Sequence, residues 1–143
     1  MTFEPILLKL AELVEAALPA DSPWCGRVTP NVADPKDLPG NTWCVVELTG
    51  GAREIVEGNL TMSATVRVVG VLVPTEGTWN AADVRGHMEY LGQAVRDALE
   101  DLAASEFEAC QILHAQVASP VEVQAVRAVG YSGEVEISLV VQF

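Results

Sequence analysis

Carboxylates are the most abundant side chains that could do chemistry, since the chain carries 20 Asp and Glu residues. Glu134 and Glu136 stand two residues apart in an alternating segment, which puts both on one face of a predicted strand. General acid–base catalysis uses such neighbouring carboxylates. Because pairs arise by chance in so acidic a chain, we interpret this one as a solvated face or a subunit contact, and we expect no enzyme.

Thiols and imidazoles are few and scattered. Cys25, Cys44 and Cys110 are an odd number without CxxC spacing, which is typical of reduced, packed thiols in a reducing compartment. A Cys25–Cys44 disulfide stays open, as does a Cys–His nucleophile pair brought together by folding. His87 and His114 lack the spacing of metal ligands. We therefore predict no metal site, and structural or surface roles for both histidines.

The glycines do not form a phosphate-binding loop. Gly50-Gly51 lies between two predicted strands rather than between a strand and a helix, and no GxxxxGK[ST] motif occurs. The GxSxG motif of serine hydrolases is also missing. We expect no nucleotide or other cofactor.

Apolar residues set among charges indicate contacts with other proteins. Thr49–Asn59 lies between two predicted strands and is too long for a tight hairpin turn, so we expect it to project as an arm. Ile55 and Val56 lie on it between charged residues, which fits either a mobile loop or a flap that docks on a partner. Trp79 and Tyr90 fit core or interface anchors, with the core favoured. The candidate interface residues are Arg53, Glu54, Ile55, Val56, Glu57, Trp79, Tyr90, Glu134 and Glu136.

Length and charge restrict the classes of function. A chain of 143 residues that is 50% hydrophobic forms one folded domain. Its net charge of −12 disfavours binding to nucleic acid or to anionic membranes. Met1–Ala20 has no basic n-region, so we expect no signal peptide, and no apolar run reaches the length of a membrane span.

Two segments have the periodicity of amphipathic helices. Phe3–Leu18 carries apolar residues at steps of three and four. Ala81–Ala104, with Asn80 as its N-cap, is the clearer of the two. Gly86 and Gly92 weaken it by about 1 kcal/mol each relative to Ala, and they would permit close packing on a sheet. Its apolar seam is Val84, Met88, Leu91, Val95, Ala98 and Leu102.

Period-two alternation predicts the strands. In the first half they are Thr42–Leu48 and Leu60–Val73, preceded by the Pro-rich connector Ala20–Asn41 with a short strand around Gly26–Thr29.

The last third of the chain is predicted as strand. Ile112–Val129 is one long strand or two broken at Pro120. Gly130–Gly133 makes a turn, and a final alternating strand runs to Phe143. The order helix, strands, helix, strands predicts a single α+β domain over residues 1–143, with two principal helices packed on a mixed, mainly antiparallel sheet.

This element order resembles the tail terminator, or tail completion, proteins of long-tailed bacteriophages. The resemblance covers nearly the whole chain and lies in order and texture rather than in a motif. It rests on the amphipathic first helix, the Pro-rich connector, a Gly- and Glu-bearing arm, the long strand Leu60–Pro74, a capped second helix and the closing strand Gly133–Phe143.

The resemblance implies a structural role in the virion, with no catalysis. Such proteins form a ring, typically a hexamer, that caps the tail tube, stops its polymerisation and offers a surface to the head. The implied partners are further copies of the chain, the tail tube protein and the head–tail connector protein. DNA would pass through the lumen without specific binding, and assembly would take place in the bacterial cytoplasm.

Three other functions stay open. A head–tail connector protein of the same virions would bind the portal side rather than the tube. A small cytosolic α+β domain that binds a ligand or acts as an enzyme would show a deep apolar pocket with converging polar groups. A protein-binding adaptor unrelated to viruses would be revealed by its genomic neighbours.

Overall fold

The structure is a computed structural model that describes residues 4–30, 43–72, 81–105, 111–117, 124–126 and 130–142. Within these residues the chain forms two helices and six strands. In chain order they are α1 (Glu4–Ala17), β1 (Val28–Pro30), β2 (Trp43–Val56), β3 (Asn59–Leu72), α2 (Ala81–Ala104), β4 (Gln111–Val117), β5 (Gln124–Val126) and β6 (Gly130–Gln142).

All the strands belong to one mixed sheet in the order β1-β2-β3-β6-β4, and β5 pairs with β6 beside this path. Only β1 and β2 run parallel, and every other pair is antiparallel. The long strands β2, β3 and β6 form the centre, where β3 pairs with both neighbours over most of its length. The predicted α+β class, with a mixed and mainly antiparallel sheet, is confirmed.

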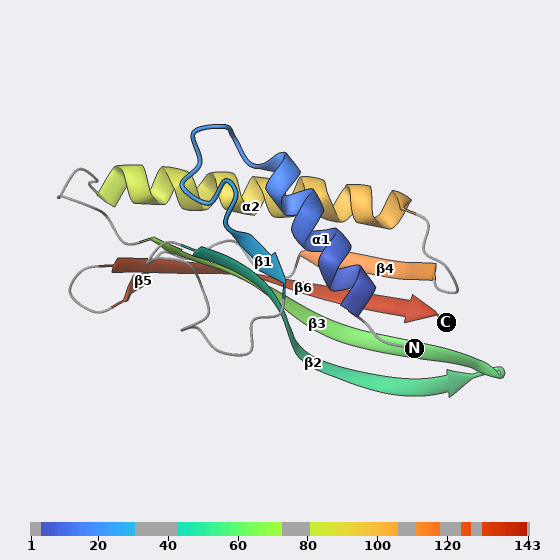
Figure 1. Cartoon of the computed structure of the whole chain (residues 1–143). Coiled ribbons are helices and arrows are strands. Elements are labelled where there is room, and N and C mark those ends of the chain that lie inside the picture. Colours follow the sequence, from blue (N-terminus) through green and yellow to red (C-terminus); the bar gives the residue numbers. More distant parts are fainter. Residues whose placement is uncertain are drawn as a thin grey trace.

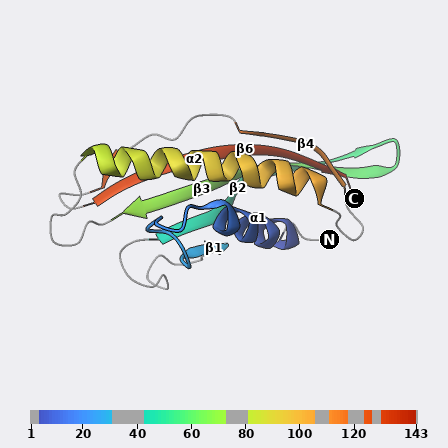
Figure 2. The same cartoon turned by 90° about the horizontal axis from the view of Figure 1, so that it is seen from above.

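Both helices cover the same face of the sheet (Figures 1 and 2). α1 packs against α2 because its residues at steps of three and four are apolar, and Ile6, Leu10 and Val14 are buried. α2 has the predicted bounds, and its seam is buried at Met88, Leu91, Val95, Ala98 and Leu102. The side chain of Val84 lies outside the described residues.

The core lies between the helices and the even-numbered positions of β3 together with the odd-numbered positions of β6. It includes Val66 and Val68 of β3, and Ile137 and Leu139 of β6, each 0–1% exposed.

Within the described residues, no helix is both long and apolar enough to cross a membrane.

Trp24 anchors the chain after α1 to the sheet. Its side chain is fully buried, and its Nε1 donates a hydrogen bond to the backbone oxygen of Val71, 3.3 Å away. The indole fits because Gly70 stands beneath it: a Cβ at Gly70 would lie 2.8 Å from both Trp24 and Leu91. The carboxylate of Glu15 accepts hydrogen bonds from backbone N–H groups after this turn and so ties α1 to the start of β1.

Two predicted boundaries are wrong. The strand predicted to begin at Thr42 does not end at Leu48, because β2 continues to Val56. Gly130–Gly133 is not a turn, since these residues begin β6, where residues 131–133 pair with β3 and Gly130 pairs with β5. Of the two alternatives for Ile112–Val129, the described residues show two strands, β4 and β5, both paired to β6. The predicted break at Pro120 and the predicted strand end at Phe143 lie outside the described residues.

Candidate assembly surface

A β-hairpin leaves the body of the molecule beyond the helices. We call residues 49–65 the arm: they comprise the second half of β2, the turn Glu57-Gly58 and the first half of β3. Figures 1 and 2 show the arm extending past the end of α2 and curving away from the helices. The predicted projection of this segment is therefore confirmed, but it is a hairpin and not a loop. Residues 61–65 of β3 also pair with β6, so the hairpin is two-stranded only at its tip, residues 55–60.

The arm closes with a two-residue turn. Glu57 and Gly58 have φ angles of 52° and 82°, and Val56 pairs with Asn59 across them. Positive φ at both central residues is the geometry of the type I′ turn, which suits the twist of a hairpin. Glycine adopts this conformation freely, whereas Glu57 is strained in it. The sequence has Glu-Gly at this turn rather than the usual Asn-Gly, and for this reason the turn was not predicted.

A β-bulge at Thr49 marks the base of the arm. Leu48 pairs with Val66 and Gly50 pairs with Thr65, so Thr49 is an extra residue in β2. The Thr49 hydroxyl donates a hydrogen bond to the backbone oxygen of Thr65 at 3.1 Å, and this holds the bulge in place. Bulges bend a strand and change which face its later side chains occupy.

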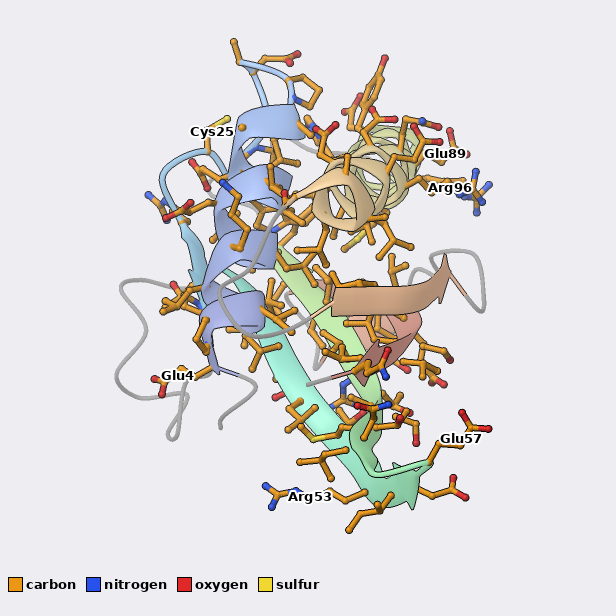
Figure 3. The ribbon with its side chains drawn as sticks, turned by 90° about the vertical axis from the view of Figure 1, so that its right-hand side faces the viewer. Glu4, Cys25, Arg53, Glu57, Glu89 and Arg96 are labelled. Atoms are coloured by element: carbon orange, nitrogen blue, oxygen red, sulfur yellow. The ribbon has the colours of Figure 1, made fainter. Side chains whose placement is uncertain are left out.

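The bulge determines the two sides of the arm. Arg53 is opposite Met62 and Ile55 is opposite Leu60, so these side chains lie on the side of the sheet that carries the helices. Glu54 is opposite Thr61, on the other side. Figure 3 shows Arg53 and Glu57 pointing in opposite directions from the end of the arm. On the side that carries the helices, the core extends along the arm as far as Met62, which is 9% exposed, whereas Ile55 nearer the tip is 75% exposed.

The outer edge of β2 is open along the arm. Within the described residues, β1 pairs with β2 only at Cys44–Val46. Among the described residues, no strand pairs with residues 47–56 of β2 on that edge. The backbone N–H and C=O groups of every second residue therefore point outward there, while those of the others point toward β3. An open edge of this length is a surface on which another chain can add a strand.

The sheet face opposite the helices carries a charge network. Arg67 on β3 donates from Nε to Glu47 on β2 at 2.8 Å, and from Nη1 to Glu134 on β6 at 3.3 Å. Glu136 is the cross-strand neighbour of Arg67. The hydrogen bond to Glu47 is the main cause that raises the pKa of Arg67. This cation binds Glu47 and Glu134, and Glu136 lies on the same face beside it.

The predicted interface residues are thus not one cluster. Arg53, Glu54 and Glu57 are exposed on the arm, and Val56 is described by its backbone alone, at the end of β2. Glu134 and Glu136 are exposed on the face away from the helices. Tyr90 is 59% exposed on α2, so the favoured core placement of this residue is wrong. Trp79 lies outside the described residues.

The described thiols are free, and they differ in reactivity. Cys25 is exposed and Cys44 is buried, with no disulfide between them. Burial, with a smaller contribution from the charge of Glu15, raises the pKa of Cys44 to about 12. Cys44 therefore stays protonated at neutral pH and is a poor nucleophile. Cys110 lies outside the described residues.

Sequence reasoning missed Glu47 and Arg67 as members of a site. Each was visible only as a polar residue in a predicted strand, and their contact depends on the register between β2 and β3. Among the described side chains, no group of three or more His, Cys, Asp and Glu residues is arranged to hold a metal ion. The side chain of His114 lies outside them.

The comparisons with known proteins identify no relative of this chain. Neither a scan of protein-family models nor a search of curated proteins finds a match to this chain. The resemblance to tail terminators therefore rests on the element order and texture of the sequence.

Proposed function

We propose that this protein is a structural component of phage assembly. It forms a ring that caps the tail tube of a long-tailed bacteriophage, stops polymerisation of the tube and offers a surface to the head. The observation that carries this proposal is the arm, a projecting hairpin whose outer edge is open and whose Ile55 is 75% exposed. A chain that acted alone would gain nothing from an uncovered ribbon of this kind.

A closed ring requires a heterologous contact, in which one surface of each copy meets a different surface of the next. The arm supports such a contact because it projects from one end of the sheet and is distinct from the helical face and from β4 at the opposite edge. An arm that docks on a neighbour's body makes a heterologous contact, which gives a ring where the rotation between copies closes.

The charge supports a DNA-conducting lumen. Each copy carries a net charge of −12, and the face opposite the helices presents Glu47, Glu134 and Glu136 around Arg67. We place this face toward the lumen, where it would repel the phosphate backbone and let the genome pass without adhering. The partners are further copies of the chain, the tail tube protein and the head–tail connector protein, in the virion.

Electron microscopy of the purified protein, alone and mixed with tail tubes, tests this proposal. We expect rings in the first sample and caps at one end of the tubes in the second. The Ile55→Glu variant should keep its fold by circular dichroism and lose rings and caps, because it places a charge where an apolar contact is needed. Tyr90→Glu, at a similarly exposed apolar residue on α2, is the matched comparison for the arm.

Two results would contradict the proposed function as a tail terminator. A monomer that ignores tail tubes would exclude a terminator. Rings that bind portal complexes and ignore tubes would instead identify a head–tail connector of the same virions.

A further inference from the structure

The side of the arm that faces the helices combines one cation with one large apolar residue. The bulge at Thr49 brings Arg53 and Ile55 onto this side, two residues apart on β2. Both are exposed, and the ion pairs of the described residues involve Lys9 and Arg67 but not Arg53. A partner that fits this side presents an apolar residue next to a carboxylate.

The exposed stripe of α1 has this chemistry. Leu8 is 48% exposed, and Glu4 and Glu12 flank it at four-residue spacing, so all three lie along one side of the helix. Glu12 meets Lys9 at 3.9 Å, but its side chain is 73% exposed and remains accessible to another cation. We call Glu4, Leu8 and Glu12 the α1 stripe.

The other exposed apolar residues fit less well. Tyr90 is 59% exposed on α2, but its neighbours three and four residues away are Gly86, His87, Gln93 and Ala94, none of them acidic. Leu48, 41% exposed, lies at the base of the arm itself. Of the two large hydrophobic residues exposed on the helices in the described part of the chain, Leu8 and Tyr90, only Leu8 has carboxylates four residues before and after it.

We propose that Arg53 and Ile55 of one copy dock on the α1 stripe of a second copy, with Ile55 against Leu8 and Arg53 against Glu12. The contact does not form within one chain, because Ile55 and Leu8 both stay exposed in the folded protein. It joins two different surfaces, so repetition around an axis gives a closed ring. The inference rests on the proposed function, since it specifies how the ring closes.

A charge-reversal cycle tests the contact. Arg53→Glu and Glu12→Arg are each expected to raise the concentration needed for half-assembly by about tenfold or more, since each places like charges face to face. The double variant restores the opposite charges and the original net charge, and it should assemble nearly as well as the parent chain. Sedimentation velocity at one fixed ionic strength gives the readout.

Arg96→Glu is the matched control. Arg96 is exposed on α2, away from the arm (Figure 3), and the substitution changes the net charge by the same amount as Arg53→Glu. We expect it to assemble like the parent chain. Equal weakening by Arg96→Glu and Arg53→Glu would overturn the proposal, because the effect would then belong to net charge.

Crosslinking gives a second, independent readout. Chains with Leu8→Cys and chains with Ile55→Cys, both with Cys25 and Cys110 replaced by Ser, are mixed and oxidised. A crosslinked dimer should form in the mixture and in neither variant alone.

The failures are distinguishable. If the parent chain forms no rings, both the function and this contact are wrong. If rings form but the double variant does not regain assembly, or the crosslink is missing, the contact alone is wrong. Loss of tube capping by Arg53→Glu with normal rings would assign this side of the arm to the tube protein and would also overturn the contact.

Discussion

Arg67 is the residue on which the charged face of the sheet depends. It lies across from Glu47 on one neighbouring strand and Glu136 on the other, and it also binds Glu134. Without a cation at this position, three carboxylates would face one another at cross-strand distances, and like charges directly opposite destabilise a sheet. The network is half-exposed, so water and salt reduce each interaction.

Arg67→Gln is expected to lower the free energy of unfolding by about 1 kcal/mol, since it removes the ion pairs and leaves the repulsion. The loss should shrink between about 0.1 M and about 1 M salt, where the screening length falls from about 10 to 3 Å. Urea denaturation at the two salt concentrations measures both effects. Arg96→Gln, at an exposed helix position, should change stability by less than about 0.5 kcal/mol; a salt-independent loss at Arg67 would contradict the electrostatic explanation.

At the scale of single residues, contacts between side chains that lie far apart along the chain could not be predicted from the sequence. That Glu134 and Glu136 share a face followed from alternation alone. That Arg67 lies between them and Glu47 did not, because the contacts span 20 and 67 residues. Tyr90 shows the converse problem: its type suits a core or a surface, and only the position of α2 on the sheet decides between them.

Helices were more predictable than strands for a physical reason. α2 has the predicted bounds because its apolar seam repeats with the helical period over 24 residues, which is local information. β2 was cut short because Gly50-Gly51 is typical of a turn, whereas here it follows a bulge inside a strand. The true turn, Glu57-Gly58, has only one glycine, so its composition gave little signal.

Alanine substitutions at Gly70 and Gly86 distinguish the effect of side-chain packing on stability from the effect of backbone conformational preference. A Cβ at Gly70 would lie 2.8 Å from Leu91 and Trp24, so Gly70→Ala should destabilise the protein by about 1–3 kcal/mol. At Gly86 nothing lies within 4 Å of the added Cβ, so this glycine does not serve the close packing on a sheet that the sequence suggested. Gly86→Ala should therefore stabilise α2 by about 0.5–1 kcal/mol.

Thermal unfolding of the two alanine variants is the measurement. Opposite shifts of Tm are expected. A shift in the same direction for both would show that helix or strand propensity, and not the space beside Trp24, dominates at these positions.

At the scale of the whole molecule, net charge would oppose the assembly that we propose for the arm. Each copy brings a charge of −12, so neighbouring copies repel one another at low salt. The cation Arg53 relieves this repulsion only locally. Assembly must therefore balance a short-range contact against a longer-range repulsion that salt screens.

Ring formation should strengthen as salt rises from about 0.01 M to about 0.15 M, because the screening length falls from about 30 to 8 Å. The tail tube should have the same effect, since it adds contacts that outweigh the repulsion. Sedimentation velocity over a salt series measures the change. Rings whose stability does not depend on salt would refute this account of the charge.

The open edge of β2 also determines how the purified chain behaves in the test tube. Along residues 47–56, the outward-facing backbone groups of every second residue have no strand partner among the described residues. This edge invites indiscriminate strand addition, and the main protection of an isolated copy is its negative charge. That protection vanishes near the isoelectric point, about 4.3. Acidified solutions should therefore deposit a sheet-rich precipitate rather than rings. For the same reason, the protein should stay soluble when it is stored dilute and at mildly alkaline pH.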